Sequence, residues 1–280
     1  MTKFKSILIS ILAMFVLILS QSSAILLASL FMDLGVPKSI GYALAGIFYI
    51  AFTFFFLYIL CYKIFKLDFE YFGITKFKLK IKWLIVAFLL PIAVKGFFLL
   101  FIDGSYISND LSNEKTIEVL LNGIFFVGLA AGFVEEMIFR GVVFRSLDKA
   151  WGRKIAVIVP SFLFGVVHIM GNFSGLSCIL TVLAGTCVGI MFSMITIEAA
   201  SVWSNAIVHT IWNIVIIGGG LFIAGKANDQ AIMSYVIKSK SVALTGGDFG
   251  IESSVIGLVA YIVVALIAYF MIKKNDKADA

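Results

Sequence analysis

The chain has 280 residues, of which 61% are hydrophobic and only 14% are charged. Soluble globular domains carry about a quarter charged residues, and this chain has more apolar surface than one soluble core can bury. The net charge of +6 does not indicate nucleic-acid binding, because the lysines lie between apolar segments and no basic patch interleaves with aromatic residues. The composition predicts an all-α, polytopic membrane protein, a single integral membrane domain over residues 1–280.

Apolar runs of the length that crosses a bilayer, roughly 20 residues, recur along the whole chain. About eight transmembrane helices are expected, forming a bundle. Their approximate bounds are 6–32, 39–62, 82–102, 117–144, 154–171, 175–196, 201–224 and 254–272. The longest polar connections, 63–81 and 225–253, contain no internal repeat and no soluble domain.

The first segment has two interpretations. Lys3 and Lys5, followed by an apolar run and the small residues of 21–24, resemble a secretory signal peptide with its cleavage site. The apolar run continues to Met32, however, which makes the stretch long enough to span a membrane. An uncleaved first helix is therefore the preferred interpretation.

Basic residues gather on alternate connections between the expected helices. They are Lys3, Lys5, the lysines of 63–82, Arg145, Lys149, Arg153, Lys154, Lys273, Lys274 and Lys277. Short loops rich in Lys and Arg stay on the cytoplasmic side, so the pattern predicts cytoplasmic N- and C-termini and an even number of spans. The Lys-, Ile- and Phe-rich composition favours a bacterial cell membrane.

Two pairs of glycines at a spacing of four residues predict close helix packing. Gly128 and Gly132 form one pair, and Gly185 and Gly189 form the other. In lipid, such pairs let helix backbones approach each other closely.

A few strongly polar side chains are expected at membrane depth. An ionised group at the bilayer centre costs at least about 2.5–3.5 kcal/mol, so such groups face the protein interior or water and are functional candidates. The set is Lys95, Glu135, Glu136, Arg140, His168, Asn205, His209 and Asn213.

The fourth segment contains the motif Glu-Glu-Met-Ile-Phe-Arg at 135–140. Glu136 and Arg140 are four residues apart, so they share a helix face and can pair. Glu135 lies about 100° around the helix from Glu136 and has no such partner, which suits a general base. In the alternative interpretation, all three charges belong to one structural ion-pair network.

Two further helices each carry a polar constellation at helical spacing. Phe164 and His168 are four residues apart in the fifth segment, and His209 and Asn213 are four apart in the seventh. A His and an Asn one turn apart can donate hydrogen bonds to a developing oxyanion, or they can simply bridge two helices.

Convergence of the three helices would place a glutamate and two histidines at one site. This set suggests water activation for hydrolysis. It also leaves open a zinc ion held by Glu135, His168 and His209 with one free coordination position. The His-Glu-x-x-His helix of common zinc proteases is absent from the sequence, and no cofactor is favoured.

The three motifs Glu-Glu-x-x-x-Arg, Phe-x-x-x-His and His-x-x-x-Asn, in this order, resemble the CAAX-processing and bacteriocin-processing family of intramembrane proteases (CPBP, also called Abi or Rce1-like). They cover about 80 residues, from Glu135 to Asn213. The remaining helices match only in general character. The resemblance implies a catalytic core within 117–224.

The resemblance also implies a role for each motif residue. Glu135 and His168 would hold and activate the attacking water, and His209 and Asn213 would stabilise the oxyanion. Supporting residues would be Glu136, Arg140 and Phe164, the last being part of the Phe-x-x-x-His motif. A metal-free mechanism is preferred, with zinc as the alternative.

The implied activity is cleavage of a peptide bond in a peptide or lipid-anchored protein within the membrane, with roles in bacteriocin processing or self-immunity among the expectations. Two other functions remain open. A non-catalytic immunity or scaffold protein would keep the fold without the chemistry, although it would have no need of the intact motifs. A proton-coupled transporter would use buried Glu, His and Arg as a relay, although paired broken helices and a two-fold repeat are not evident.

One expectation conflicts with the motif assignment. The helix bounds place Glu135 in the inner half of its segment and His168 near the outer end of its own. The two must lie at one level to share a water molecule, so the fifth helix should be shifted or its bounds misjudged by about a turn.

Overall fold

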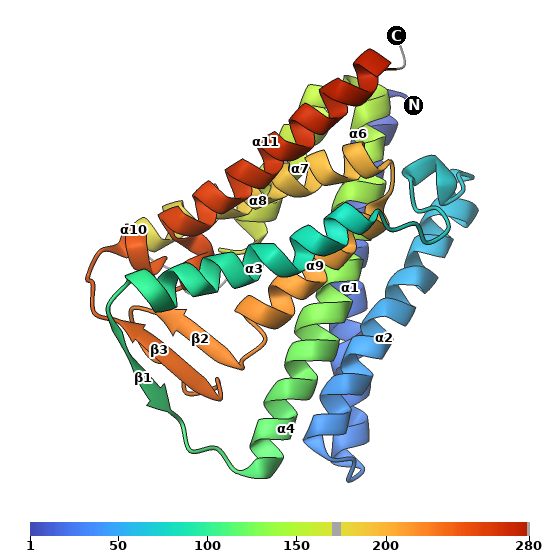
Figure 1. Ribbon diagram of the computed structural model, residues 1–280. Helices are drawn as coiled ribbons and strands as arrows, with labels where there is room; N and C mark the ends of the chain where they lie inside the picture. The colour runs from blue at the N-terminus through green and yellow to red at the C-terminus, as the bar shows by residue number, and fades with distance from the viewer. Residues whose placement is uncertain (170–174, 279–280) are drawn as a thin grey trace.

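The computed structural model describes residues 1–169 and 175–278, and most of them are helical (Figure 1). The last two residues of the expected fifth segment, 170 and 171, and the side chain of Lys277 lie outside the described residues. All eight expected segments are helical at least in part. The helices are α1 (Lys3–Asp33), α2 (Lys38–Tyr58) with η1 (Ile59–Phe65), α3 (Ile81–Phe101), the compound helix α4–α6, α7 (Arg153–Val167), α8 (Leu176–Ala199), α9 (Val202–Ile216) and α11 (Val255–Ala278).

Six of these helices are long and apolar enough to cross a membrane. The described residues of α7 and α9 form helices of only 15 residues each, short of the roughly 20 needed for a full span. The all-α, multi-pass architecture is thus confirmed, whereas the count of eight transmembrane helices stays a prediction.

The compound helix runs without interruption over Asn113–Trp151, 39 residues. It changes geometry along its length, as α4 (Asn113–Leu121), η3 (Asn122–Ala130), α5 (Ala131–Glu136), η4 (Met137–Val143) and α6 (Phe144–Trp151). Both η3 and η4 are π-helical. π-Helical stretches are rare and frequent at functional sites, and here they enclose the short α5 segment that carries both motif glutamates.

A small β-sheet, which the sequence analysis did not predict, lies within the connections of the helical bundle. Strands β1 (Gly104–Ser108), β2 (Leu221–Ala224) and β3 (Met233–Ile237) form a sheet of order β1-β3-β2, antiparallel between β1 and β3 and parallel between β2 and β3. The expected seventh helix, 201–224, was therefore too long, because α9 ends at Ile216 and β2 begins after three consecutive glycines at 218–220. Consecutive glycines are strong helix breakers. Two short elements, α10 (Val242–Thr245) and η5 (Ile251–Ser253), complete the connection to α11.

The glycine pairs lie where helices touch, as predicted. A Cβ at Gly132 would come within 2.7 Å of the backbone nitrogen of Thr210 on α9, and one at Gly185 within 2.5 Å of the Gly165 Cα on α7. Glycine is therefore required for these close approaches. They hold the compound helix against α9, and α7 against α8.

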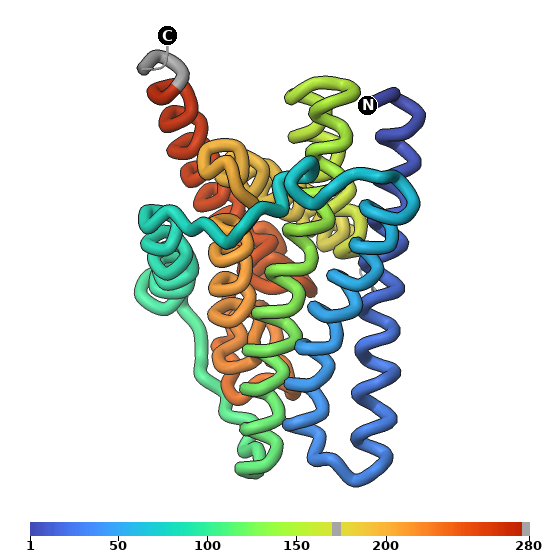
Figure 2. The backbone as a smooth tube through the Cα atoms, turned by 90° about the vertical axis from the view of Figure 1, so that its right-hand side faces the viewer, coloured from blue at the N-terminus to red at the C-terminus, as the bar shows by residue number. Residues whose placement is uncertain are grey.

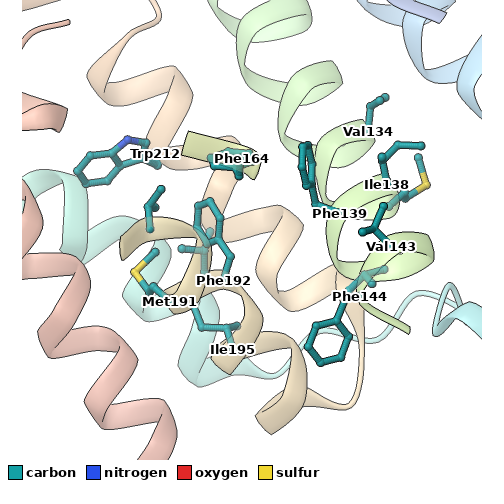
Figure 3. Close-up of a cluster of buried hydrophobic side chains, with 14 of the residues drawn as sticks. Val134, Ile138, Phe139, Val143, Phe144, Phe164, Met191, Phe192, Ile195 and Trp212 are labelled. Carbon is teal, nitrogen blue, oxygen red and sulfur yellow. The ribbon is translucent and has the colours of Figure 1, made fainter. Parts of the chain in front are cut away.

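Aromatic and aliphatic side chains fill the space between the compound helix, α7 and α8 (Figure 3). Phe139 of η4 packs edge-on against Phe164 of α7, with ring centroids 5.2 Å apart. Phe164 in turn contacts Phe192 of α8 at 6.4 Å. These three rings form a packed aromatic surface beside the motif residues.

The N-terminal end of α1 and the last described turns of α11 lie at the same end of the molecule in both views (Figures 1 and 2). This arrangement is compatible with the expected even number of crossings, which stays a prediction. The location of these two ends in the cytoplasm also stays a prediction.

Candidate active site

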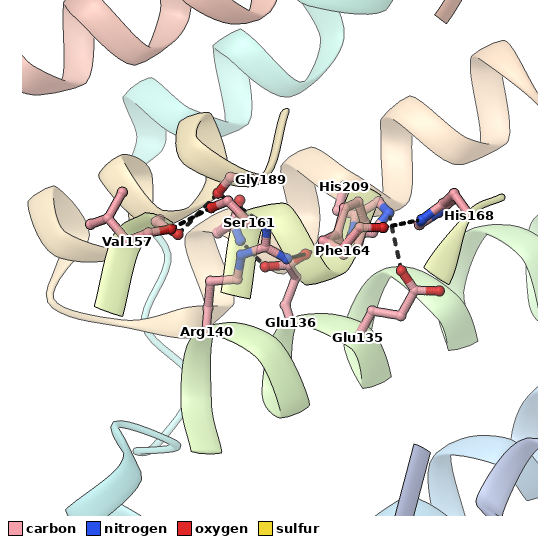
Figure 4. A network of polar contacts seen from close by, with 11 residues as sticks. Glu135, Glu136, Arg140, Val157, Ser161, Phe164, His168, Gly189 and His209 are labelled. Atoms are coloured by element: carbon pink, nitrogen blue, oxygen red, sulfur yellow. Dashed lines mark hydrogen bonds and ion pairs between the residues drawn. The ribbon is translucent and has the colours of Figure 1, made fainter. Parts of the chain in front are cut away.

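Glu136 is the centre of a fully buried polar cluster. Its Oε1 accepts hydrogen bonds from Arg140 Nη1 at 3.0 Å and lies 2.8 Å from His209 Nδ1, and its Oε2 accepts a short bond from Asn205 Nδ2 (Figure 4). The predicted pairing of Glu136 with Arg140 is confirmed, and both side chains are 0% exposed. Glu136, Arg140, Asn205 and His209 are called the Glu136 cluster below. It ties the compound helix to α9.

Arg140 is surrounded by aromatic rings as well as by its partner. Its guanidinium carbon lies 4.7 Å from the Phe164 ring centroid and 5.2 Å from that of Phe192. Nη2 donates to the Gly189 carbonyl at 3.1 Å. A buried cation is stabilised by an ion pair, hydrogen bonds and ring faces together. Phe164, expected as a supporting residue, contacts the Arg140 guanidinium, and its supporting role stays a prediction.

Glu135 has a different environment from its neighbour. Its side chain is 20% exposed, against 0% for Glu136. Its Oε2 has no hydrogen-bond partner among the described residues, and His209 Nε2 is 3.9 Å away. The two adjacent acids are therefore inequivalent, and the carboxylate of Glu135 is the one with free hydrogen-bonding capacity.

His168 is fixed by its own helix. It caps the C-terminal end of α7, and its Nδ1 lies 2.6 Å from the Phe164 carbonyl oxygen. Because a carbonyl can only accept, Nδ1 carries the proton and Nε2 of the neutral ring is left as an acceptor. The imidazole also packs on the Phe164 ring at 4.5 Å.

Asn213 of α9 contacts the backbone of the compound helix. Its Nδ2 donates to the Val127 carbonyl at 2.9 Å. Val127 lies in the π-helical η3, and Asn213 is one α-helical turn after His209 on α9. This bond uses one of the two amide hydrogens of Asn213.

Glu135, His168, His209 and Asn213 line one cavity, whose empty space is about 800 Å³. The structure thus brings together the four residues expected to be catalytic, from the compound helix, α7 and α9. The mismatch in level that the expected helix bounds gave for Glu135 and His168 does not occur. Helix α7 has 15 residues and ends just before His168, which lies on the same side of the Glu136 cluster as Glu135 (Figure 4). Two other polar groups expected at membrane depth, Asn205 and Lys95, do not line this cavity. Asn205 belongs to the Glu136 cluster, and Lys95 donates a short hydrogen bond to the Val215 carbonyl.

The connection before α11 closes part of the cavity, a feature that sequence reasoning missed. Phe249 packs edge-on against His168, with ring centroids 6.0 Å apart. Glu252 and Ser253 of η5 also line the cavity. Burial raises the pKa of Glu252 to about 8, and a hydrogen bond from the Trp212 side chain lowers it in part. An acid just before an apolar segment was the available sequence signal, but it was assigned to a polar loop.

A zinc ion does not fit the described residues as they are arranged. No three His, Cys, Asp or Glu side chains among residues 1–169 and 175–278 converge at metal-binding spacing. His209 Nδ1 is engaged by Glu136 and His168 Nδ1 by a carbonyl, so the two Nε2 atoms and the Glu135 carboxylate would have to hold an ion, and in the described residues they do not converge. No step is derived through a metal.

Comparison with known proteins identifies one family. Residues 117–215 match the family model described as type II CAAX prenyl endopeptidase Rce1-like. The matched segment contains all three motifs, so the resemblance to this protease family is confirmed. Comparisons with curated proteins and with solved structures gave no significant match.

Proposed function

Since residues 117–215 match the family model described as type II CAAX prenyl endopeptidase Rce1-like, we propose that the protein is an endopeptidase that cleaves a membrane-associated peptide with Glu135 as general base. One observation carries this proposal. Glu135 keeps an unpaired carboxylate oxygen in a cavity shared with His168 and His209, while the adjacent Glu136 is saturated by partners.

Glu135 and His168 would activate water together. The Glu135 carboxylate removes one proton of the water, and His168 Nε2 accepts a hydrogen bond from the other. The water oxygen then bonds to the carbonyl carbon of the substrate, and the carbonyl electron pair moves to its oxygen. When the C–N bond breaks, the proton held by Glu135 passes to the leaving nitrogen.

His209 and Asn213 would stabilise the oxyanion. His209 Nδ1 faces the Glu136 carboxylate, so its Nε2 donates to an oxyanion only when the ring is doubly protonated. Asn213 keeps one amide hydrogen after its bond to Val127. Two donors of this kind typically lower the barrier by several kcal/mol.

The biological setting is proposed more broadly. The substrate would be a peptide or lipid-anchored protein, and a bacterial cell membrane with both termini in the cytoplasm would be the location. Bacteriocin processing or self-immunity is one such role. A catalytically silent immunity or scaffold protein is the competing function, and it predicts that the motif residues are dispensable.

Cleavage of reporter peptides by the purified protein in detergent tests the proposal. Glu135→Gln should lower the rate by about 10²–10⁴-fold, the usual contribution of a general base, and His209→Ala should lower it through loss of the oxyanion donor. Glu114→Gln, an exposed acid at the start of α4, is the matched control and should keep the wild-type rate.

Two results would change the proposal. A Glu135→Gln variant that cleaves the peptide at the wild-type rate removes the assigned base, whereas a wild-type protein that cleaves no peptide favours the scaffold alternative. Inhibition by a chelator that is reversed by zinc would replace the metal-free mechanism with one in which Glu135, His168 and His209 rearrange around the ion.

A further inference from the structure

The cavity contains polar atoms that the proposed chemistry does not use. Ser253 Oγ and Thr181 Oγ1 are buried and have no hydrogen-bond partner among the described residues. Their residues are 0% and 1% exposed, and both line the cavity. A buried hydroxyl without a partner is costly, so these two atoms indicate that something else satisfies them.

Glu252 is the neighbour of Ser253 and lines the same cavity. Among the described residues it has no ion-pair partner, and no Lys or Arg lines the cavity. The cavity therefore contains two carboxyl groups, those of Glu135 and Glu252, and no permanent cation. These two carboxyl groups favour a cationic occupant, because a nearby cation stabilises the ionised form of a buried acid.

The backbone around Glu252 is held firmly. The Tyr261 hydroxyl donates to the Glu252 carbonyl at 3.1 Å, and the Ser254 hydroxyl donates to the Ile251 carbonyl at 2.5 Å. Helix α8, which carries Thr181, packs against η5. The carboxyl and the two hydroxyls are thus supported by rigid elements, as a recognition site requires.

We propose that Glu252, Ser253 and Thr181 form a specificity subsite that binds a cationic amino group of the substrate near the scissile bond. This inference rests on the proposed endopeptidase function. An ammonium group has three N–H donors and no acceptor, and the subsite offers one carboxylate and two free hydroxyl oxygens. The raised pKa of Glu252, about 8 because of burial, fits an acid whose charge the protein leaves uncompensated until a cation binds.

The subsite is tested with two peptides that differ at one position near the cleaved bond, where one has Lys and the other norleucine. The measured quantity is the ratio of their kcat/KM values. Wild-type protein should prefer the Lys peptide in kcat/KM by about 10- to 100-fold, the usual range for a charge-assisted hydrogen bond. Glu252→Gln should bring this ratio close to one. Glu252→Asp should keep part of it, and Thr181→Val and Ser253→Ala should each lower it less than Glu252→Gln does.

Asp248→Asn is the control for disturbance of the same connection. Asp248 pairs with Lys226 at 2.8 Å and is not part of the cavity lining. This variant should keep the wild-type ratio. Acetylation of the peptide N-terminus separates the two sources of an amino group: if the preference follows the free N-terminus instead of Lys, the subsite binds an α-amino group.

Binding measurements separate this inference from the endopeptidase function. Affinity of both peptides is measured for Glu135→Gln and for the same variant with Glu252→Gln, so cleavage is not needed. A Lys preference that disappears with Glu252 supports the subsite even if no peptide is cut. Equal affinities for the two peptides in the Glu135→Gln background, or a preference that survives Glu252→Gln in a folded variant, overturns it.

Discussion

Two clusters around a buried carboxylate, one beside the cavity and one away from it, differ in what surrounds the acid. The Glu136 cluster lies beside the cavity. The Glu198 cluster, defined as Glu198, Lys80, Lys82 and Trp83, joins the end of α8 to the start of α3. Glu198 lies 3.1 Å from Lys80 Nζ and 2.5 Å from Lys82 Nζ, and it accepts from Trp83 Nε1 at 2.7 Å.

Both carboxylates are 0% exposed and saturated by donors. The difference lies in what surrounds them. The lysines of the Glu198 cluster are 32% and 38% exposed and can reach water, whereas Arg140 is 0% exposed. Of the two clusters, only the Glu136 cluster includes a residue that lines the cavity, His209, whose Nε2 lies 3.9 Å from Glu135 Oε2. We therefore propose that the Glu198 cluster is structural and that the Glu136 cluster supports the proposed chemistry through His209.

Removing the charge of Glu136 should have the largest effect on this comparison. Glu136→Gln leaves Arg140 buried without a counter-ion, and breaking a buried pair in this way costs about 3–5 kcal/mol. Thermal and denaturant unfolding in detergent measures the loss. The double variant Glu136→Gln/Arg140→Met should recover much of the stability, because no uncompensated charge remains. If it does not recover, the pair is not the source of the loss.

An overpacked glycine should come next. Gly132→Ala places a methyl group against the Thr210 backbone. The methyl group should push the compound helix away from α9 and so separate Glu135 from His209. Overpacking should lower the free energy of unfolding by about 1–3 kcal/mol. The cleavage rate of the protein that remains folded should also fall, because Glu135 and His209 are moved apart. Gly96→Ala on α3, where a Cβ meets no atom within 4 Å, is the control. Equal effects of the two substitutions would show that helix separation does not matter.

The smallest effect should come from the second cluster. Glu198→Gln leaves Lys80 and Lys82 near water, so a loss of about 1–2 kcal/mol is expected from the hydrogen bonds alone. The fluorescence of Trp83 should shift as its acceptor changes, and the activity of the folded protein should stay close to wild type. A loss as large as that of Glu136→Gln would break the distinction between the two clusters.

Much of the membrane architecture and of the motif geometry was predictable from sequence. Lipid requires long apolar helices, so hydropathy located all eight segments, and the spacing of four residues correctly paired Glu136 with Arg140. The distinction between Glu135 and Glu136 also followed from helical geometry and agrees with their exposures.

The parts that sequence reasoning missed depend on long-range contacts. The sheet joins β1 to β3 across more than 120 residues of chain, and strands of four or five residues give little local signal. Glu198 and Glu252 stand at the ends of apolar segments, where an acid normally faces water; only the folded chain shows their burial against distant elements. The glycines at 218–220, by contrast, were a readable helix stop.

The π-helical turns beside α5 have a consequence for insertions and deletions. Each residue of an α-helix advances the direction of a side chain by about 100°, and η3 and η4 fix that direction for Glu135 from both sides. Loss of a single residue from 122–130 would let the stretch relax into an α-helix and turn the following segment relative to the preceding one. The direction of the Glu135 side chain therefore depends on the number of residues that precede it in the compound helix, and not only on the presence of a glutamate at this position.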